Sequence, residues 1–146
     1  SEDVFVDLLF QDAPNHGAVL LVNEFARAFV DVNRSPGELD PKLISDVFGS
    51  DVDFNTARVK AGLGVIPRTV GDGLAIYKGR MSRSEAQQRI REVHVPWHTA
   101  IETQLAKMAQ FNGMAILIDC HSMPSSASGN PAYDGRSGAV PARCRL

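Results

Sequence analysis

The sequence predicts an α/β fold in which helices flank a mixed sheet. A continuous apolar run at residues 18–22 is typical of a buried strand. A helix that starts at Ser82 leads through a second helix into another apolar run at residues 114–118. Because helices that are followed at once by buried strands usually belong to crossover connections, this order favours a largely parallel sheet covered by helices.

The elements before the first of these helices are short and separated by turns. Residues 1–10 fit a helix, because acidic residues occupy its first turn, where the helix dipole favours negative charge. A turn-rich segment at residues 12–17 separates this helix from the first strand. Further extended segments are expected at residues 28–34 and 63–66, with a long irregular excursion at residues 35–60 between them.

The segment from residue 82 to residue 113 carries the clearest helix signals. Ser82 and Glu85 form a capping box, in which each side chain satisfies a backbone N–H of the first turn. Pro96 is expected to open a second helix, because the first turn needs no backbone donor there. Gly113 stands at the expected end of that helix. The second helix has an apolar stripe that is expected to be buried: Trp97, Ile101, Leu105 and Met108.

Composition excludes several classes of protein. The chain has 146 residues, 44% hydrophobic and 22% charged, with a net charge of −2, which suits one ordinary globular domain. The sequence contains no basic patch with interleaved aromatic residues, so a nucleic-acid partner is not expected. It also contains no apolar run long enough to predict a membrane-spanning helix. Cys120 and Cys144 lack metal-site or framework spacing, so a reduced, cytoplasmic setting is expected. Residues 126–146 are rich in Ser, Gly and Pro and are expected to form a loop-like tail.

Asp119 and His121 follow the last expected strand, where open α/β sheets bind their ligands. Their spacing of two places both side chains on one face of an extended chain. A carboxylate and an imidazole on one face suit a divalent metal such as zinc. The alternative that this spacing leaves open is a capping aspartate beside an ordinary surface histidine.

Three more side chains are candidates for binding or catalysis. Arg34 ends the stretch Asp31-Val-Asn-Arg34, where a guanidinium can fork onto a substrate carboxylate; the alternative is an ion pair with Asp31. Arg27 is a second, weaker candidate for the same role. His98 lies near a helix start, where the dipole favours a neutral imidazole, which can donate to a substrate or simply pack and cap.

Four stretches of the chain, taken in order, carry a family resemblance. Residues 3–10 and residues 25–36 correspond to an early helix and to an arginine signature that ends in Asp-x-Asn-Arg. Pro96-Trp97-His98 corresponds to a Pro-Tyr-His motif, and residues 119–124 to an Asp-Cys-His-Ser motif. Together, over a domain at residues 1–125, they resemble the N-formylglutamate amidohydrolase family, also called the N-formylglutamate deformylases.

The resemblance implies a fold similar to that of zinc carboxypeptidases, also described as phosphorylase/hydrolase-like, with one metal at the strand ends. It implies hydrolysis of N-formyl-L-glutamate, or a similar N-acyl amino acid, to formate and glutamate, a step of histidine breakdown. The expected partner is thus a small anionic substrate. The implied roles are metal binding by His121 and Asp3, carboxylate binding by Arg34 and Arg27, catalysis by His98, and support of these groups by Asp119 and Asp31.

Departures from the family pattern open other interpretations. Members usually have a Pro-His-Ser-Gly-type segment before residue 1 and further strands after Ser125, so the domain is expected to be incomplete at both ends. A non-catalytic remnant that keeps the fold and binds a small dicarboxylate is therefore the second interpretation. An unrelated α/β binding module is the third. The sequence does not define the oligomeric state.

Overall fold

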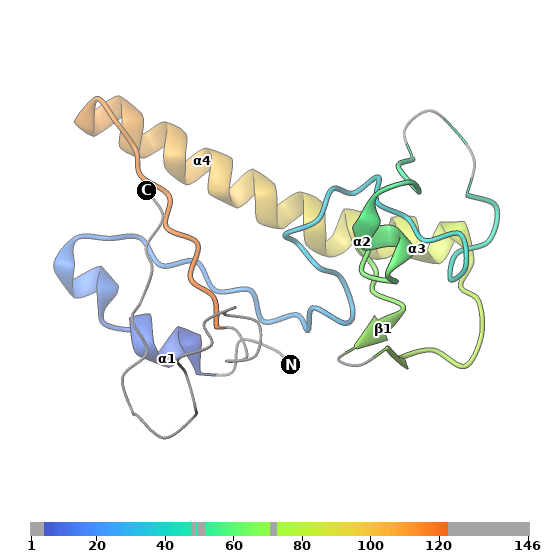
Figure 1. The fold of residues 1–146 in the computed structure, drawn as a ribbon. Helices are drawn as coiled ribbons and strands as arrows, with labels where there is room; N and C mark the ends of the chain where they lie inside the picture. Colours follow the sequence, from blue (N-terminus) through green and yellow to red (C-terminus); the bar gives the residue numbers. More distant parts are fainter. Residues whose placement is uncertain (1–4, 48, 50–51, 71–72, 123–146) are drawn as a thin grey trace, which may run out of the picture.

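A computed structural model of the chain describes residues 5–47, 49, 52–70 and 73–122. Its elements are small apart from one long helix (Figure 1). In chain order they are α1 (Val6–Phe10), the 3-10 helix η1 (Ala13–His16), α2 (Ala57–Lys60), β1 (Thr69–Val70), β2 (Leu74–Ala75), α3 (Arg83–Arg89), the π-helix η2 (Ile90–His94) and α4 (Val95–Asn112).

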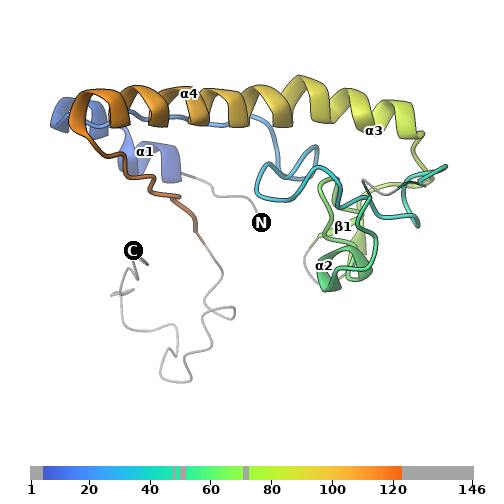
Figure 2. The same cartoon turned by 90° about the horizontal axis from the view of Figure 1, so that it is seen from above.

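The long helix is formed by α3, η2 and α4 without a break (Figure 2). Its start confirms the Ser82 half of the predicted capping box, because the Ser82 hydroxyl accepts a hydrogen bond of 3.2 Å from the backbone N–H of Glu85. The Glu85 carboxylate instead pairs with Arg89 one turn further on. The expected separate start at Pro96 is wrong in detail. Proline donates no backbone hydrogen bond, so helical pairing has to change near it, and the π turn directly before α4 absorbs that change. Gly113, with φ of 76°, ends α4 as predicted.

The core lies under the α3 end of this helix and consists mainly of loops. Residues 38 and 64 approach so closely that a Cβ on Gly64 would collide with the carbonyl oxygen of Glu38. The same carbonyl accepts a 2.9 Å hydrogen bond from Val65. The buried hydrophobic cluster comprises Val30, Val32, Leu39, Leu43, Ile44, Val47, Val65, Ile66, Met81, Ala86 and Val93.

The segment that leads into the candidate site is fastened to α3. The Tyr77 hydroxyl donates a 3.1 Å hydrogen bond to the carbonyl oxygen of Ala28, and Arg89 donates one of 2.9 Å to the same hydroxyl. The Arg89 guanidinium also lies 4.5 Å from the ring centre of Phe29, as a cation over an aromatic face. These contacts hold the start of the segment at residues 28–34 against α3.

The predicted strands are not found in the described residues, whose only sheet is the antiparallel hairpin of β1 and β2, with Thr69 opposite Ala75. Residues 28–34 form turns instead, because the N–H of Arg34 bonds back to the carbonyl of Asp31. Residues 18–22, 63–66 and 114–118 join no ladder in the described part of the chain. The coarse expectation of helices with a sheet therefore holds, whereas the expected larger sheet does not appear there.

Apolar side chains near the far end of the long helix are exposed. Ile116 and Ile118 have 65% and 68% of their surface accessible, and Phe111 on α4 has 85%. The predicted stripe from Trp97 to Met108 is half-buried, so it forms the more covered side of α4 but not a core. Over the described ranges, even α4 with its 18 residues lacks the apolar length needed to cross a bilayer.

Candidate functional site

A loop at residues 31–34 is organised around one buried carboxylate. Asp31 is 5% exposed. Its Oδ1 accepts a 3.0 Å hydrogen bond from the backbone N–H of Asn33, and its Oδ2 lies 3.1 Å from Nη2 of Arg27 and 3.7 Å from Nε of Arg34. The backbone N–H of Asp31 donates to the carbonyl of Val65, which ties the loop to the core. A buried charge needs such partners to be tolerated.

Two histidines from the long helix hold the same loop. Nε2 of His94 lies 2.8 Å from the carbonyl oxygen of Arg34, and Nε2 of His98 lies 2.8 Å from that of Val32. A carbonyl only accepts hydrogen bonds, so Nε2 carries the proton in both rings. The rings face each other with centroids 4.3 Å apart.

Burial keeps His94 neutral. Loss of solvent lowers the pKa of His94 below its usual value, and the neighbouring His98 lowers this pKa further. The hydrogen bond to the Arg34 carbonyl and the charge of Asp31 oppose the shift without cancelling it. The ring therefore donates to the loop as a neutral imidazole.

His121 reaches this loop from the segment after α4. Its Nε2 lies 2.6 Å from the side-chain amide of Asn33 and 3.0 Å from Oδ1 of Asp119. The Asn33 atom at this contact is the amide nitrogen Nδ2, which only donates, whereas the Asp119 carboxylate only accepts, so a neutral Nε2 cannot satisfy both as they are placed. With Asp119 as the acceptor, the proton of a neutral His121 ring is on Nε2 and the lone pair is on Nδ1. A half-turn of the Asn33 amide presents its oxygen to the same proton, which satisfies both neighbours.

The structure thus brings together six of the seven side chains singled out in the sequence. Ion pairs and hydrogen bonds link Arg27 and Arg34 to Asp31, His98 to the loop, and Asp119 to His121. The ion pair between Arg34 and Asp31 that the sequence left open is present. The seventh residue, Asp3, lies outside the described residues, and so does the predicted tail at residues 126–146.

Sequence reasoning missed two residues of this arrangement. Asn33 connects the loop to His121, and its place between Asp31 and Arg34 in the signature was a usable signal. His94 precedes His98 by four residues, a spacing that puts both rings on one face of a helix. In the described ranges, no group of three or more His, Cys, Asp and Glu side chains is close enough to hold a metal ion.

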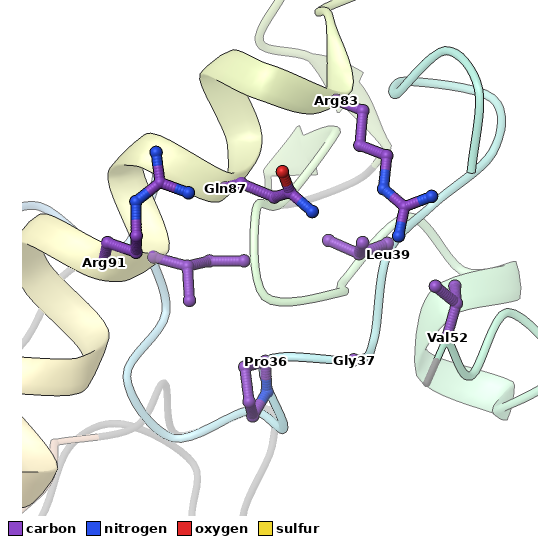
Figure 3. A pocket seen from close by; sticks show the side chains of 8 residues that line it. Pro36, Gly37, Leu39, Val52, Arg83, Gln87 and Arg91 are labelled. Atoms are coloured by element: carbon purple, nitrogen blue, oxygen red, sulfur yellow. The ribbon is translucent and has the colours of Figure 1, made fainter. Parts of the chain in front are cut away.

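A separate cleft of about 390 Å³ lies on another side of α3 (Figure 3). Arg83, Gln87 and Arg91 project toward it from one face of the helix, and Leu39 and Val52 lie opposite them. Neither His121 nor the two loop-bound histidines line this cleft. It is therefore distinct from the arrangement around residues 31–34.

The fold and the site are defined by one arrangement: an Asp-x-Asn-Arg loop that histidines of the long helix hold against an Asp-x-His segment. The sequence model of the N-formylglutamate amidohydrolase family matches residues 1–141, and the chain belongs to that family, as the sequence motifs predicted.

Two relatives support this membership. An N-formylglutamate deformylase of Pseudomonas aeruginosa is 31% identical over 137 residues, which cover 92% of this chain and 44% of that protein. The crystal structure of N-formylglutamate amidohydrolase from Ralstonia eutropha JMP134 matches with a TM-score of 0.79 and 28% identity, over 86% of this chain and 44% of that one. The chain thus spans less than half the length of either relative.

Proposed function

We propose that this chain forms part of an amidohydrolase that hydrolyses the formyl amide bond of N-formyl-L-glutamate, giving formate and glutamate. The observation that carries the proposal is the contact between Asn33 and His121, which joins the arginine loop to the Asp-x-His segment. The names of both relatives, a deformylase and an amidohydrolase of N-formylglutamate, supply the substrate.

Arg34 and Arg27 are assigned to the two carboxylates of the substrate. A guanidinium can meet a carboxylate with two parallel hydrogen bonds, and N-formylglutamate carries two such groups. The Arg27 side chain is 36% exposed and that of Arg34 is 19% exposed, so both retain access to solvent. Asp31 pairs with both groups, and the Arg34 guanidinium also donates to the carbonyl oxygens of Leu63 and Asn33. A guanidinium that is already aligned in this way loses less conformational freedom on binding.

His121 fits the role of a metal ligand, although a metal dependence is part of the proposal only. An imidazole whose one nitrogen bonds to a carboxylate presents the other nitrogen as a lone-pair donor, which is the usual setting of metal-binding histidines. Asp119 supplies that carboxylate here. Asp3 is the proposed further ligand. When bound, a divalent metal such as zinc would polarise the formyl carbonyl and acidify water.

The finer fold is proposed on the same basis. The apolar runs at residues 18–22 and 114–118 would be strands of a mixed sheet similar to that of zinc carboxypeptidases. Their apolar side chains on both faces suit strands covered from two sides.

The test is release of formate from N-formyl-L-glutamate by the purified protein, measured with and without added zinc. Removal of the proposed metal ligand in His121→Ala should abolish release and lower the zinc content measured by elemental analysis. His16→Ala is the matched control, because His16 is exposed and pairs only locally with Asp12. Formate release that survives His121→Ala would refute the assignment.

The non-catalytic interpretation makes a different prediction for the same protein. A remnant that only binds a dicarboxylate would release no formate, yet calorimetric titration with glutamate would show saturable binding that Arg34→Ala removes. Absence of both turnover and binding would reject both interpretations.

A further inference from the structure

Asn33 is the residue on which the proposed site depends, and its backbone is held on both sides. The carbonyl oxygen of the preceding residue, Val32, accepts a hydrogen bond from His98, and the carbonyl oxygen of the following residue, Arg34, accepts one from His94. Both distances are 2.8 Å. The two imidazoles therefore bracket a single residue.

A third contact completes the bracket. The backbone N–H of Asn33 donates to Oδ1 of Asp31, which is itself buried. The peptide unit before Asn33 is thus held at the Val32 carbonyl and at the Asn33 N–H. The unit after it is held as well, because the Asn33 carbonyl accepts a hydrogen bond from Nη1 of Arg34 and the Arg34 N–H donates to the Asp31 carbonyl. The backbone around Asn33 therefore has little freedom to rotate. Its side chain is then directed at one target, Nε2 of His121.

The helix supplies both histidines because of its π turn. His94 ends η2 and His98 lies in the first turn of α4, so their separation of four residues places both rings on one face. The π turn changes the direction of that face relative to α3, whose own apolar side packs Ala86 into the core. In one continuous helix, α3 therefore packs against the core, and the segment from His94 onward binds the loop.

Neutral donors suit this position. The charged groups around the histidine pair are Asp31 with its partners Arg27 and Arg34, and, beyond Asn33, His121 with Asp119. A lysine in place of either histidine would put another cation beside two guanidinium groups. An imidazole donates the same hydrogen bond without that charge.

We propose that His94 and His98 are positioning residues that hold Asn33 against His121, and that neither acts on the substrate through its Nε2. The inference rests on the proposed function, since it concerns the same site. It differs from the expectation that His98 donates to the substrate, because the donating nitrogen is committed to the Val32 carbonyl.

The kinetic test compares substitutions that keep or remove the donor. A glutamine amide can occupy the place of Nε2, so His94→Gln should retain kcat within about threefold, whereas His94→Phe should lower kcat about tenfold with KM little changed, as expected for one lost hydrogen bond. His98→Gln and His98→Phe should show the same contrast, with kcat largely kept in the first variant and lowered in the second. If His94→Phe does not fold, His94→Asn replaces it, because its shorter amide does not reach the carbonyl. Equal losses for the donor-keeping and donor-lacking variants would overturn the proposal.

A double-mutant cycle separates positioning from general destabilisation. If His94 acts through Asn33, then His94→Phe should change kcat less than about twofold when Asn33→Ala is already present. Multiplicative effects of the two substitutions would overturn the proposal. His16→Gln serves as the control that tests an imidazole outside the bracket.

A readout without turnover keeps this inference separate from the proposed function. Long-range proton–nitrogen NMR spectra of the imidazoles should show His94, His98 and His121 with the proton on Nε2. In His94→Phe the His121 signal should move toward mixed tautomers, and in His94→Gln it should not. A protein that releases no formate but shows this pattern would refute the proposed function and support the bracket; an unchanged His121 signal in both variants would overturn the bracket.

Discussion

Replacement of Asp31 by asparagine should test whether the site loop depends on one buried charge. The asparagine oxygen can still accept from the N–H of Asn33, so the variant removes the charge and retains the turn. It removes the negative charge of Asp31 that pairs with the guanidinium groups of Arg27 and Arg34. The variant isolates the ionic part of the interaction.

The expected loss in the free energy of unfolding is about 2–4 kcal/mol. Hydrogen bonds to charged groups contribute about 1.5–3 kcal/mol each. The contribution of Arg27 is reduced by its 36% exposure, and that of Arg34 by its longer distance of 3.7 Å. The Asp31 side chain is only 7% exposed, so water screens its attraction to the two guanidinium groups only weakly, and little of that attraction is discounted.

Urea unfolding followed by circular dichroism would measure this difference. Asp12→Asn is the matched control, because Asp12 pairs with His16 at 3.1 Å in a setting where both side chains are more than half exposed. The control should change the free energy of unfolding by less than about 0.5 kcal/mol. An effect of Asp31→Asn no larger than that of the control would show that the loop is not organised by this carboxylate.

Three other predictions concern protonation, substrate binding and the helix end. Because the folded protein lowers the pKa of His94, the unfolded chain binds more protons below about pH 6.5. The free energy of unfolding should therefore fall as the pH falls through that range. Urea titrations at several pH values should show that His94→Gln weakens this dependence. Arg34→Ala should raise KM for N-formyl-L-glutamate by the equivalent of about 2–4 kcal/mol, whereas Arg58→Ala at an exposed position of α2 should not; equal KM values in steady-state assays would remove Arg34 from substrate binding. Gly113→Ala should destabilise the protein by about 1 kcal/mol through its left-handed backbone alone, since a Cβ there meets no atom within 4 Å. Gly79 is equally uncrowded but has no left-handed φ, so Gly79→Ala should lower the stability measured by thermal unfolding by less.

Local signals in the sequence were enough to predict the two ends of the long helix. Ser82 caps α3 through a contact only three residues long, and Gly113 ends α4 through its own backbone conformation. Such features depend on neighbours within one turn, so the sequence around them contains the whole interaction. The prediction failed where Pro96 was expected to separate two helices, because no short motif indicates a π turn. It also failed at two short helices: α1 begins only at Val6, since Phe5 before it has a left-handed backbone, and α2 lies within the stretch that was expected to be irregular.

The strands could not be predicted in the same way. An apolar run shows that its side chains favour burial, but a strand also needs a neighbouring strand for its backbone hydrogen bonds. Ile116 and Ile118 satisfy the first condition in sequence, and in the described residues no neighbour meets the second. The small hairpin at β1 and β2 was missed for the opposite reason, since two residues per strand carry no periodic pattern.

The site was predictable as a set of residues and not as a set of contacts. The motifs named Arg34, His98 and His121, and these residues do meet around one loop. The contact that joins them runs between Asn33 and His121, 88 positions apart in the chain. No local pattern encodes such a pairing, because it arises from the path that the chain takes back from the end of α4.

The π turn at Ile90–His94 makes this region more sensitive to length than to composition. Deletion of a single residue there would let the helix continue with ordinary α pairing and would rotate α4 by about 100° relative to α3. The imidazoles of His94 and His98 would then lose their hydrogen bonds to the loop, although every side chain of the site would still be present in the sequence. Exchanges of side chain on the outer surface of this turn leave that rotation untouched. The spacing between the core-facing helix and the histidine pair is thus itself a component of the site, one that a residue-by-residue inventory does not contain.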